Sequence, residues 1–299
     1  MRDFKTSDDV LKALEECKYI CDHPLATTIF LSLKMDKPLF LEGEAGVGKT
    51  EVAKVLAQVL DTKLIRLQCY EGLDVSTSLY EWNYPKQMLA IKMAEAHLEP
   101  KERVEQEIFS QEFLIQRPLL EAIQNEQGSP PVLLIDEIDR SDEEFEAFLL
   151  EVLSDFQITI PEIGTIKAKH KPSVVITSNR TREIRDALKR RCLYHWIEYP
   201  SFAKESQILL TKVPGIERDL ADQICHFMQL VRQGDYLKRP GIAETLDWAS
   251  ALLYLSKDSL DPEALSDTVG CIFKYKEDLD RMEKEGLDSI LDQVMKRCC

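Results

Sequence analysis

The sequence predicts an α/β protein, in which a parallel five-stranded sheet is covered by helices on both faces and is followed by a smaller all-α domain. Three observations lead to this prediction. Short apolar segments alternate with helical segments up to about residue 200. Segments such as 132–136 and 174–177 are almost wholly apolar, which is typical of parallel strands that are buried on both faces. After Pro200 no further strand pattern occurs, and residues 202–295 have the pattern of successive helices.

The elements of the first part follow one another in a regular order. The five strands are expected at residues 38–43, 64–67, 132–136, 174–177 and 196–199. The main helices are expected at residues 8–21, 24–35, 49–60, 91–109 and 142–154. The alternation of strands and helices favours a parallel sheet with crossover helices. We place the domain border after residue 203, so that residues 1–203 form the α/β domain and residues 204–299 form the helical domain and a helical tail.

Two further segments interrupt this alternation. Residues 157–160 and 165–168 flank Pro161–Gly164, and this pattern predicts a β-hairpin. Residues 81–85, which include Trp82 and end in Pro85, are expected to form an exposed loop.

Composition and charge exclude several classes of protein. The chain has 299 residues and a formal charge of −15, from 38 Lys and Arg against 53 Asp and Glu. This acidic balance disfavours nonspecific binding to nucleic acid. No apolar run approaches the roughly 20 residues that a membrane span needs, and the first ten residues carry acids where a secretory signal would be apolar. We therefore expect a cytoplasmic protein, whose eight cysteines are reduced.

A glycine-rich segment joins the first predicted strand to the helix that begins at Lys49. Its residues are Gly43, Glu44, Ala45, Gly46, Val47, Gly48, Lys49 and Thr50, which fit the pattern G-x-x-x-x-G-K-[ST]. Glycines let consecutive backbone N–H groups surround phosphate oxygens, and the helix N-terminus adds its positive dipole. In this pattern Lys49 reaches the β- and γ-phosphates and the Thr50 hydroxyl binds Mg²⁺. We include Glu51 among the nucleotide-binding candidates; the alternative is a chance glycine turn.

Two acids end the third predicted strand. Asp136 and Glu137 follow an apolar run, which places them at the carboxyl edge of a parallel sheet, beside the glycine-rich segment. Asp136 is expected to support the magnesium ion, and Glu137 to act as a general base on the attacking water. The alternative is an ordinary helix start, where Asp and Glu are common.

Two more polar sites follow along the chain. Asn179 comes after the fourth predicted strand, where its amide could orient the water or sense the γ-phosphate; the alternative is an ordinary turn asparagine. Arg190 and Arg191 follow a short helix, and a guanidinium there could stabilise a transferring phosphoryl group from a neighbouring subunit. The alternative is a solvated basic helix end. No guanine-reading tetrapeptide of the NKxD kind occurs, so ATP is favoured over GTP.

In this order the four elements resemble an AAA+ ATPase over roughly residues 20–255. The glycine-rich segment matches Walker A, Asp136-Glu137 matches Walker B, Asn179 matches sensor 1, and Arg190-Arg191 matches the arginine-finger region. The resemblance implies a P-loop NTPase fold with ATP and Mg²⁺ as ligands. It also implies a homo-oligomeric, hexameric ring with ATP at each subunit interface.

The insertions point to a subgroup within this family. The hairpin at 157–168 resembles the pre-sensor-1 insertion of one AAA+ clade, and the Trp82 region resembles its helix-2 insertion. On the phrases at 113–120, 188–192 and 239–245 the chain is similar to the MoxR group and closest to its CoxD-like members. That resemblance implies a chaperone-like remodeller that assists a metalloenzyme client of the molybdenum hydroxylase or carbon monoxide dehydrogenase type, with a von Willebrand factor A domain partner.

One position departs from the family pattern. Sensor 2 is usually an arginine at the start of a lid helix, where this chain has Gly241 or Ile242. Either Arg239 substitutes for it, or sensor 2 is absent. Three other functions stay open. They are a nucleic-acid-directed AAA+ motor, a scaffold that binds ATP without meaningful hydrolysis, and a restriction-type (McrB-like) GTPase.

Overall fold

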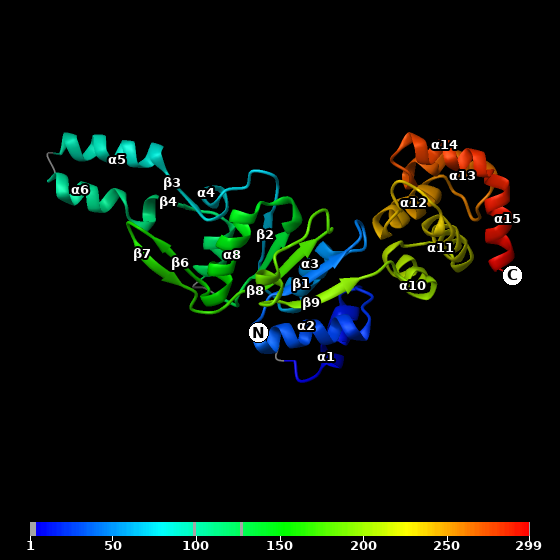
Figure 1. Ribbon diagram of the computed structural model, residues 1–299, viewed down its shortest axis with the longest axis horizontal. Coiled ribbons are helices and arrows are strands. Elements are labelled where there is room, and N and C mark those ends of the chain that lie inside the picture. Colours follow the sequence, from blue (N-terminus) through cyan, green and yellow to red (C-terminus); the bar gives the residue numbers. More distant parts are fainter. Residues whose placement is uncertain (1–3, 98–99, 126–127, 299) are drawn as a thin grey trace. The chain divides into compact units, whose positions relative to one another are not determined.

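The computed structural model describes residues 4–97, 100–125 and 128–298 (Figure 1). Its main sheet has five strands in the order β2-β5-β8-β1-β9, and the pairs β2–β5, β5–β8 and β8–β1 are parallel. The strands are β1 (Leu39–Gly43), β2 (Leu64–Gln68), β5 (Val132–Asp136), β8 (Ser173–Ser178) and β9 (Leu193–Ile197). The predicted α/β fold with a parallel five-stranded sheet is confirmed. The last strand was placed wrongly at 196–199: it begins at Leu193, whose N–H donates to Pro38 O at the start of β1.

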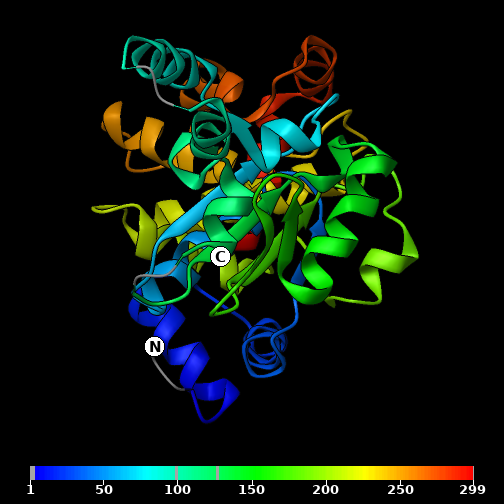
Figure 2. The same cartoon turned by 90° about the vertical axis from the view of Figure 1, so that its left-hand side faces the viewer.

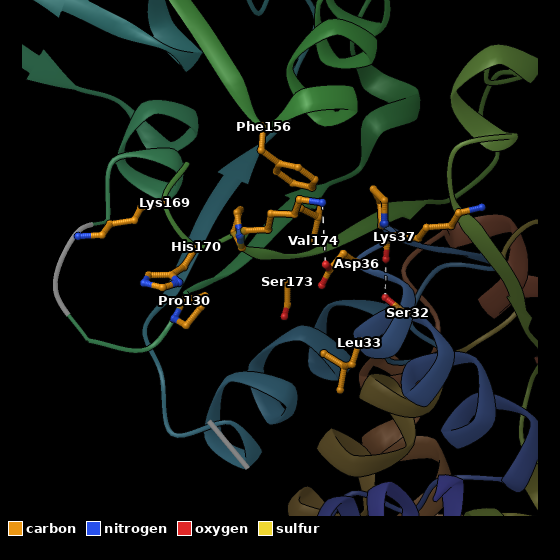
Figure 3. A pocket seen from close by; sticks show the side chains of 13 residues that line it. Ser32, Leu33, Asp36, Lys37, Pro130, Phe156, Lys169, His170, Ser173 and Val174 are labelled. Carbon is orange, nitrogen blue, oxygen red and sulfur yellow. Dashed lines mark hydrogen bonds and ion pairs between the residues drawn. The ribbon is translucent and has the colours of Figure 1, made fainter. Parts of the chain in front are cut away.

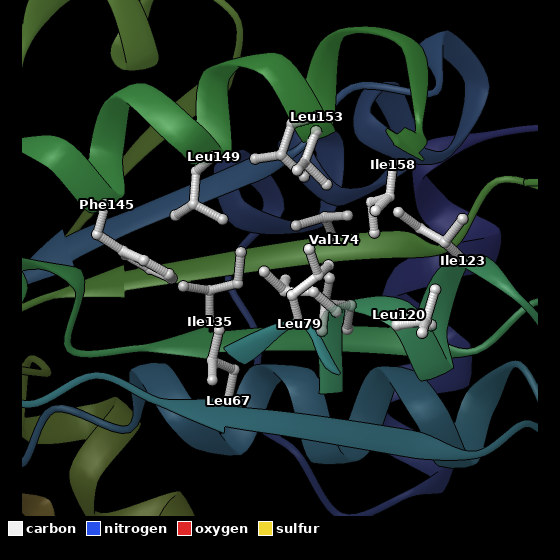
Figure 4. Packing of buried hydrophobic residues seen from close by; sticks show 14 of the residues in the cluster. Leu67, Leu79, Leu120, Ile123, Ile135, Phe145, Leu149, Leu153, Ile158 and Val174 are labelled. Carbon is white, nitrogen blue, oxygen red and sulfur yellow. The ribbon is translucent and has the colours of Figure 1, made fainter. Parts of the chain in front are cut away.

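The sheet unit also contains helices, of which α7 (Pro118–Ile123), α8 (Glu143–Asp155) and α9 (Asp186–Lys189) contribute side chains to its hydrophobic core. Further helices are α1 (Ser7–Glu16), α2 (His23–Met35), α3 (Lys49–Val59) and α4 (Val75–Ser78). In α8, Phe145, Leu149 and Leu153 recur every four residues and so share one helix face. They point toward Ile135 of β5 and Val174 of β8 (Figure 4). Each such buried side chain contributes roughly 1.5–3 kcal/mol, which holds β5 and β8 firmly in place.

A helical insertion lies between two short strands. Strands β3 (Tyr80–Trp82) and β4 (Leu114–Gln116) pair antiparallel, and α5 (Tyr84–Ala96) and α6 (Lys101–Ile108) lie side by side between them (Figure 1, Figure 2). The expectation of one helix over 91–109 is wrong. Pro100 is the N-cap of α6 and lacks an N–H, so a continuous helix through it would lose a backbone hydrogen bond.

The environment of Trp82 also differs from the prediction. Residues 81–85 were expected to form an exposed loop, but Trp82 ends β3 and is only 8% exposed. Its ring contacts Tyr80 and Phe109 edge to face. Pro85 does not break a helix here, because it occupies the first turn of α5, after the N-cap Asn83, where no N–H is needed.

The predicted hairpin is confirmed. Strands β6 (Gln157–Ile160) and β7 (Gly164–Lys167) pair antiparallel, and they follow α8 directly. The turn requires a positive φ at its last residue, and Gly164 supplies it with a φ of +97°.

The chain divides into two compact units. The sheet unit comprises residues 1–13, 23–42 and 50–196, and the helical unit comprises residues 14–22, 43–49 and 197–299. The helices of the second unit are α10 (Phe202–Lys212), α11 (Arg218–Gln233), α12 (Ile242–Tyr254), α13 (Pro262–Ile272), α14 (Lys276–Glu285) and α15 (Leu287–Cys298). They enclose their own core around Phe227 and Trp248. The domain border after residue 203 stays a prediction. Among the helices of the described segments, none is both long and apolar enough to span a membrane.

Candidate active site

Polar side chains of the sheet unit gather at the carboxyl ends of β2, β5 and β8. Parallel strands end at the same edge of a sheet, so this edge collects side chains that are far apart in the sequence. Asp136 ends β5, Thr177 lies near the end of β8, and Thr50 lies in the first turn of α3. Arg66 and Gln68 lie on β2, which pairs with β5 so that Gln68 is opposite Asp136.

Asp136 lies at the centre of this cluster and is 2% exposed. Its Oδ1 accepts hydrogen bonds from the hydroxyls of Thr50 (3.0 Å) and Thr177 (2.6 Å). Its Oδ2 accepts from Nε (3.0 Å) and Nη2 (2.6 Å) of Arg66. The buried carboxylate is therefore stabilised by four donors, one of which belongs to the threonine expected to bind magnesium.

Glu137 follows in a left-handed conformation, with a φ of +55°. This costs a non-glycine residue of order 1 kcal/mol or more, and the N–H of Glu137 is held by Thr177 Oγ1 at 2.9 Å. Asn179 Nδ2 donates to Glu137 Oε1 at 3.3 Å, and Gln68 Nε2 donates to Oε2 at 3.1 Å. Arg140 Nε also lies 3.1 Å from Oε2. The carboxylate is 34% exposed, so water can reach it.

Asp139 fixes the loop that carries Asn179. It accepts hydrogen bonds from Asn179 N (3.1 Å), Thr181 N (2.9 Å) and Thr181 Oγ1 (2.6 Å). Burial acts to raise the pKa of Asp139, but these hydrogen bonds outweigh it, and the pKa is lowered from its ordinary value of 3.8. The carboxylate is therefore ionised at neutral pH and holds the backbone after β8.

The glycine-rich segment, residues 43–49 of the helical unit, joins β1 to α3. Gly46 and Gly48 have φ angles of +77° and +95°, which residues that carry a side chain rarely adopt. Lys49 is 6% exposed, and its Nζ donates to the carbonyls of Gly43 (2.8 Å) and Glu44 (2.6 Å). A Cβ on Gly43 would lie 2.3 Å from Ile197 O, so only glycine fits there.

Gly46 also contacts the start of α12 within the helical unit. Ile242 N–H donates to Gly46 O at 2.8 Å, and a Cβ on Gly241 would lie 2.7 Å from Gly46 Cα. Position 241 therefore has no room for an arginine side chain in this arrangement. Arg239 is exposed and lines a cavity of about 290 Å³ together with Glu44 and other residues of the helical unit.

A family model for the AAA domain of the dynein-related subfamily matches residues 38–192, more than half of the chain. The chain belongs to this AAA family. The residues that end β5 and β8 lie within the matched segment.

Sequence and structure searches found further similar proteins. An uncharacterised protein of Staphylococcus aureus strain USA300 is 27% identical over 184 residues, which cover 58% of this chain and 61% of that protein. The match thus spans about three fifths of the length of this curated relative. A candidate ATPase of Cytophaga hutchinsonii is 15% identical with a TM-score of 0.48, over 97% of this chain and 93% of its own. The RuvB Holliday junction branch migration motor of Thermotoga maritima is 16% identical with a TM-score of 0.46, over 88% and 68%.

Glu51, Arg190 and Arg191 are the remaining predicted residues of the AAA domain. Glu51, in the first turn of α3, pairs with Lys54 at 3.5 Å. Arg190 is 81% exposed and lies 3.9 Å from Asp186 on α9. Arg191 is also exposed, and within the described segments no contact joins either arginine to Asp136 or Glu137.

The cluster fits a magnesium ion. Thr50 Oγ1 and Asp136 Oδ1 are 3.0 Å apart, and hydroxyl and carboxylate oxygens are ligands that Mg²⁺ accepts, with phosphate oxygens and water completing its shell.

Four residues of the cluster were missed by sequence reasoning. They are Arg66, Gln68, Asp139 and Thr177. A weak signal was present at two of them, because Arg66 and Gln68 alternate with apolar residues in a short strand and so lie on the same face.

Another cavity, of about 340 Å³, belongs to the sheet unit and lies at the amino edge of the sheet, opposite the cluster around Asp136 (Figure 3). Lys171 enters it, with its ammonium 5.7 Å from the Phe156 ring centroid and 3.9 Å from Asp36. Its charge is thus already balanced from within the protein.

Proposed function

We propose that this AAA ATPase is a MoxR-type, chaperone-like remodeller that uses ATP and Mg²⁺ to act on a protein client. The observation that carries the proposal is the pair of insertions in the sheet unit. Helices α5 and α6 are inserted between β3 and β4, and the β6–β7 hairpin is inserted between Asp136 and Asn179. One insertion precedes the catalytic acids in the sequence and the other follows them. A conformational change at these acids can therefore be transmitted to both insertions.

In this proposal the cluster at the carboxyl edge performs the hydrolysis. Lys49 and Thr50 hold the phosphates, and Asp136 orients the Thr50 hydroxyl by accepting its proton in a hydrogen bond. Glu137 takes a proton from the attacking water, while Asn179 Nδ2 fixes the direction of the Glu137 carboxylate. Bound Mg²⁺ would neutralise charge on the phosphate oxygens.

We further propose that Arg191, or Arg190, acts on the ATP of a neighbouring subunit in a homo-hexameric ring. The exposure of both side chains supports this role, because an arginine that serves another subunit must be free of strong partners in its own. Mixed rings test it. Subunits with Arg191→Ala, combined with subunits carrying Glu137→Gln, should recover part of the activity that each lacks alone, and no recovery would argue against action in trans.

The chemistry of the insertions supports a protein client. Along α5, Tyr84, Met88, Leu89 and Met93 are 55–62% exposed, an apolar surface unlike the basic surface that nucleic acid requires. The tip of the β6–β7 hairpin, Pro161–Ile163, is likewise apolar and acidic. Nucleic acid is therefore disfavoured as the substrate, in line with the chain charge of −15.

The subgroup resemblance supports a more specific proposal. We expect the client to be a metalloenzyme in the cytoplasm, of the molybdenum hydroxylase or carbon monoxide dehydrogenase type that a CoxD-like protein implies. A von Willebrand factor A domain protein is the expected partner. In the nucleotide site, Arg239 is proposed to take part in place of a sensor 2 arginine, and its position in the cavity beside Glu44 supports this.

The experiment that tests the remodelling function is client capture by a hydrolysis-deficient variant. Glu137→Gln should retain its client in the presence of ATP and release it when ATP is removed. A Met88→Ser, Leu89→Ser double variant of α5 in the same background should lose the client, because it removes the exposed apolar surface. The matched control is Glu95→Gln, an exposed change on the same helix. Equal capture with and without ATP would refute the proposal, as would turnover that prefers GTP or depends on DNA.

A further inference from the structure

We propose that Arg66 is a built-in counter-cation of Asp136 that Mg²⁺ must displace, and that it thereby sets the magnesium concentration at which the site holds nucleotide·Mg²⁺. Arg66 would then be a positioning residue that acts through Asp136. The inference rests on the proposed nucleotide chemistry of this site.

The first observation is that Asp136 has no free acceptor position. An ionised carboxylate offers about four lone-pair sites, two on each oxygen. In Asp136 these are matched by four donors, namely the hydroxyls of Thr50 and Thr177 on Oδ1, and Nε and Nη2 of Arg66 on Oδ2. At 2% exposure no solvent face is left over. A metal ion, or a water bound to it, can engage Asp136 only if one of these donors leaves.

The second observation identifies the donor that can leave. Thr177 is 1% exposed, and its Oγ1 also accepts from Glu137 N–H, so its release would break two bonds at once. Thr50 has no reason to leave, because its oxygen can bind Mg²⁺ through a lone pair while its O–H still donates to Asp136. Arg66 remains, and its side chain is 50% exposed on the long and flexible stem of an arginine.

The third observation is that a released Arg66 keeps a partner. Its Nη2 also donates to Gln68 Oε1 at 2.5 Å, two residues along the same face of β2. The guanidinium can therefore turn toward Gln68 and solvent without leaving a buried charge. In this exchange a cation of charge +1 beside the Asp136 carboxylate would give way to one of charge +2, and removal of the competing guanidinium should favour the metal.

The test measures magnesium dependence and needs no turnover. A fluorescent ATP analogue is titrated into the full chain in the Glu137→Gln background, first in EDTA and then at a series of free Mg²⁺ concentrations. Arg66→Gln should lower the half-saturating Mg²⁺ concentration by about fivefold, the effect of one half-exposed ion pair. Its affinity for the analogue in EDTA should stay unchanged. A loss of structure would instead weaken binding in both conditions.

The control and a second variant keep the result decisive. Lys63→Gln removes one positive charge immediately before β2, from a side chain that is 69% exposed and paired with Glu121, so it should leave the half-saturating Mg²⁺ concentration as it was. Arg66→Lys keeps the charge but loses the two-pronged contact, and should lower that concentration by about twofold.

The inference would be overturned if the half-saturating Mg²⁺ concentration of Arg66→Gln were unchanged or raised. It would also be overturned if Lys63→Gln lowered that concentration as much as Arg66→Gln does. If Arg66→Gln does not fold, Arg66→Lys decides alone, and an unchanged or raised requirement in that variant would overturn it. Failure of the unsubstituted Arg66 chain to bind the analogue at any Mg²⁺ concentration would instead refute the proposed function of the site.

Discussion

Thr177 connects the two acids of the site, and its replacement by valine should separate them. The Thr177 hydroxyl donates to Asp136 Oδ1 at 2.6 Å and accepts from Glu137 N–H at 2.9 Å. Valine has nearly the same shape as threonine, so Thr177→Val removes these two bonds and leaves no cavity. Thr177→Ser is the matched control, because it keeps the hydroxyl and loses only a methyl group.

The magnitude follows from the two bonds. The bond to the buried carboxylate is worth roughly 1.5–3 kcal/mol and the bond from the Glu137 amide about 1 kcal/mol, so Thr177→Val should lower the free energy of unfolding of the sheet unit by about 3 kcal/mol. Thr177→Ser should lower it by about 1 kcal/mol, the transfer value of one buried methyl group.

The same change should impair catalysis, because Glu137 is held in a left-handed conformation partly by this bond. ATP turnover of Thr177→Val should fall by at least about tenfold, since a misplaced general base loses much of its typical 10²–10⁴-fold contribution. Urea unfolding and steady-state ATP turnover of both variants measure the two effects. If Thr177→Val were as stable and as active as Thr177→Ser, the proposed role of the Thr177 hydroxyl in connecting Asp136 and Glu137 would be refuted.

Three further predictions concern other parts of the chain. Asp139→Asn should lower the free energy of unfolding at pH 7 by about 2 kcal/mol. The folded-state pKa of Asp139 lies below its ordinary value of 3.8, so this stabilisation is present above that pH and is lost as the pH falls through the folded-state pKa. Urea unfolding of the wild type and of the variant should therefore converge in acid. Gly241→Ala would bring a Cβ within 2.7 Å of Gly46 Cα, and fluorescence titration should show ATP affinity reduced by at least about tenfold, whereas Ala243→Gly, at an exposed position in the first turn of α12, should bind normally. Arg232→Met should cost the helical unit about 3–5 kcal/mol in thermal or urea unfolding, because Glu205, which is fully buried, would lose its ion partner.

Much of the fold could be predicted, because its signals are local. The apolar runs that form β1, β5 and β8 and the hairpin turn at Gly164 depend on neighbouring residues alone. Trp82 was predicted wrongly for the opposite reason. Its burial depends on Phe109, which lies on the far side of α5 and α6 in the sequence, and no local pattern reveals that contact.

The candidate residues of the glycine-rich segment, Asp136 and Glu137 were proposed from their spacing along the chain, and their roles stay predictions. In the structure the Thr50 hydroxyl donates to Asp136. Arg66 was missed because its partner depends on the strand order, which places β2 beside β5 although some sixty residues separate them. The steric role of Gly241 likewise depends on a distant segment, the loop at Gly46.

The most direct test of the central claim is ATP turnover by Glu137→Gln beside the wild-type chain, with nucleotide affinity measured on the same samples. The structure holds the Glu137 carboxylate between Asn179 and Gln68, and glutamine keeps its shape but cannot accept the proton of water. We expect turnover to fall by about 100-fold or more, while ATP affinity changes by less than about twofold, since Glu137 is not expected to hold the phosphates. Wild-type turnover by Glu137→Gln would contradict the assignment of Glu137 as the base, and with it the account of this site.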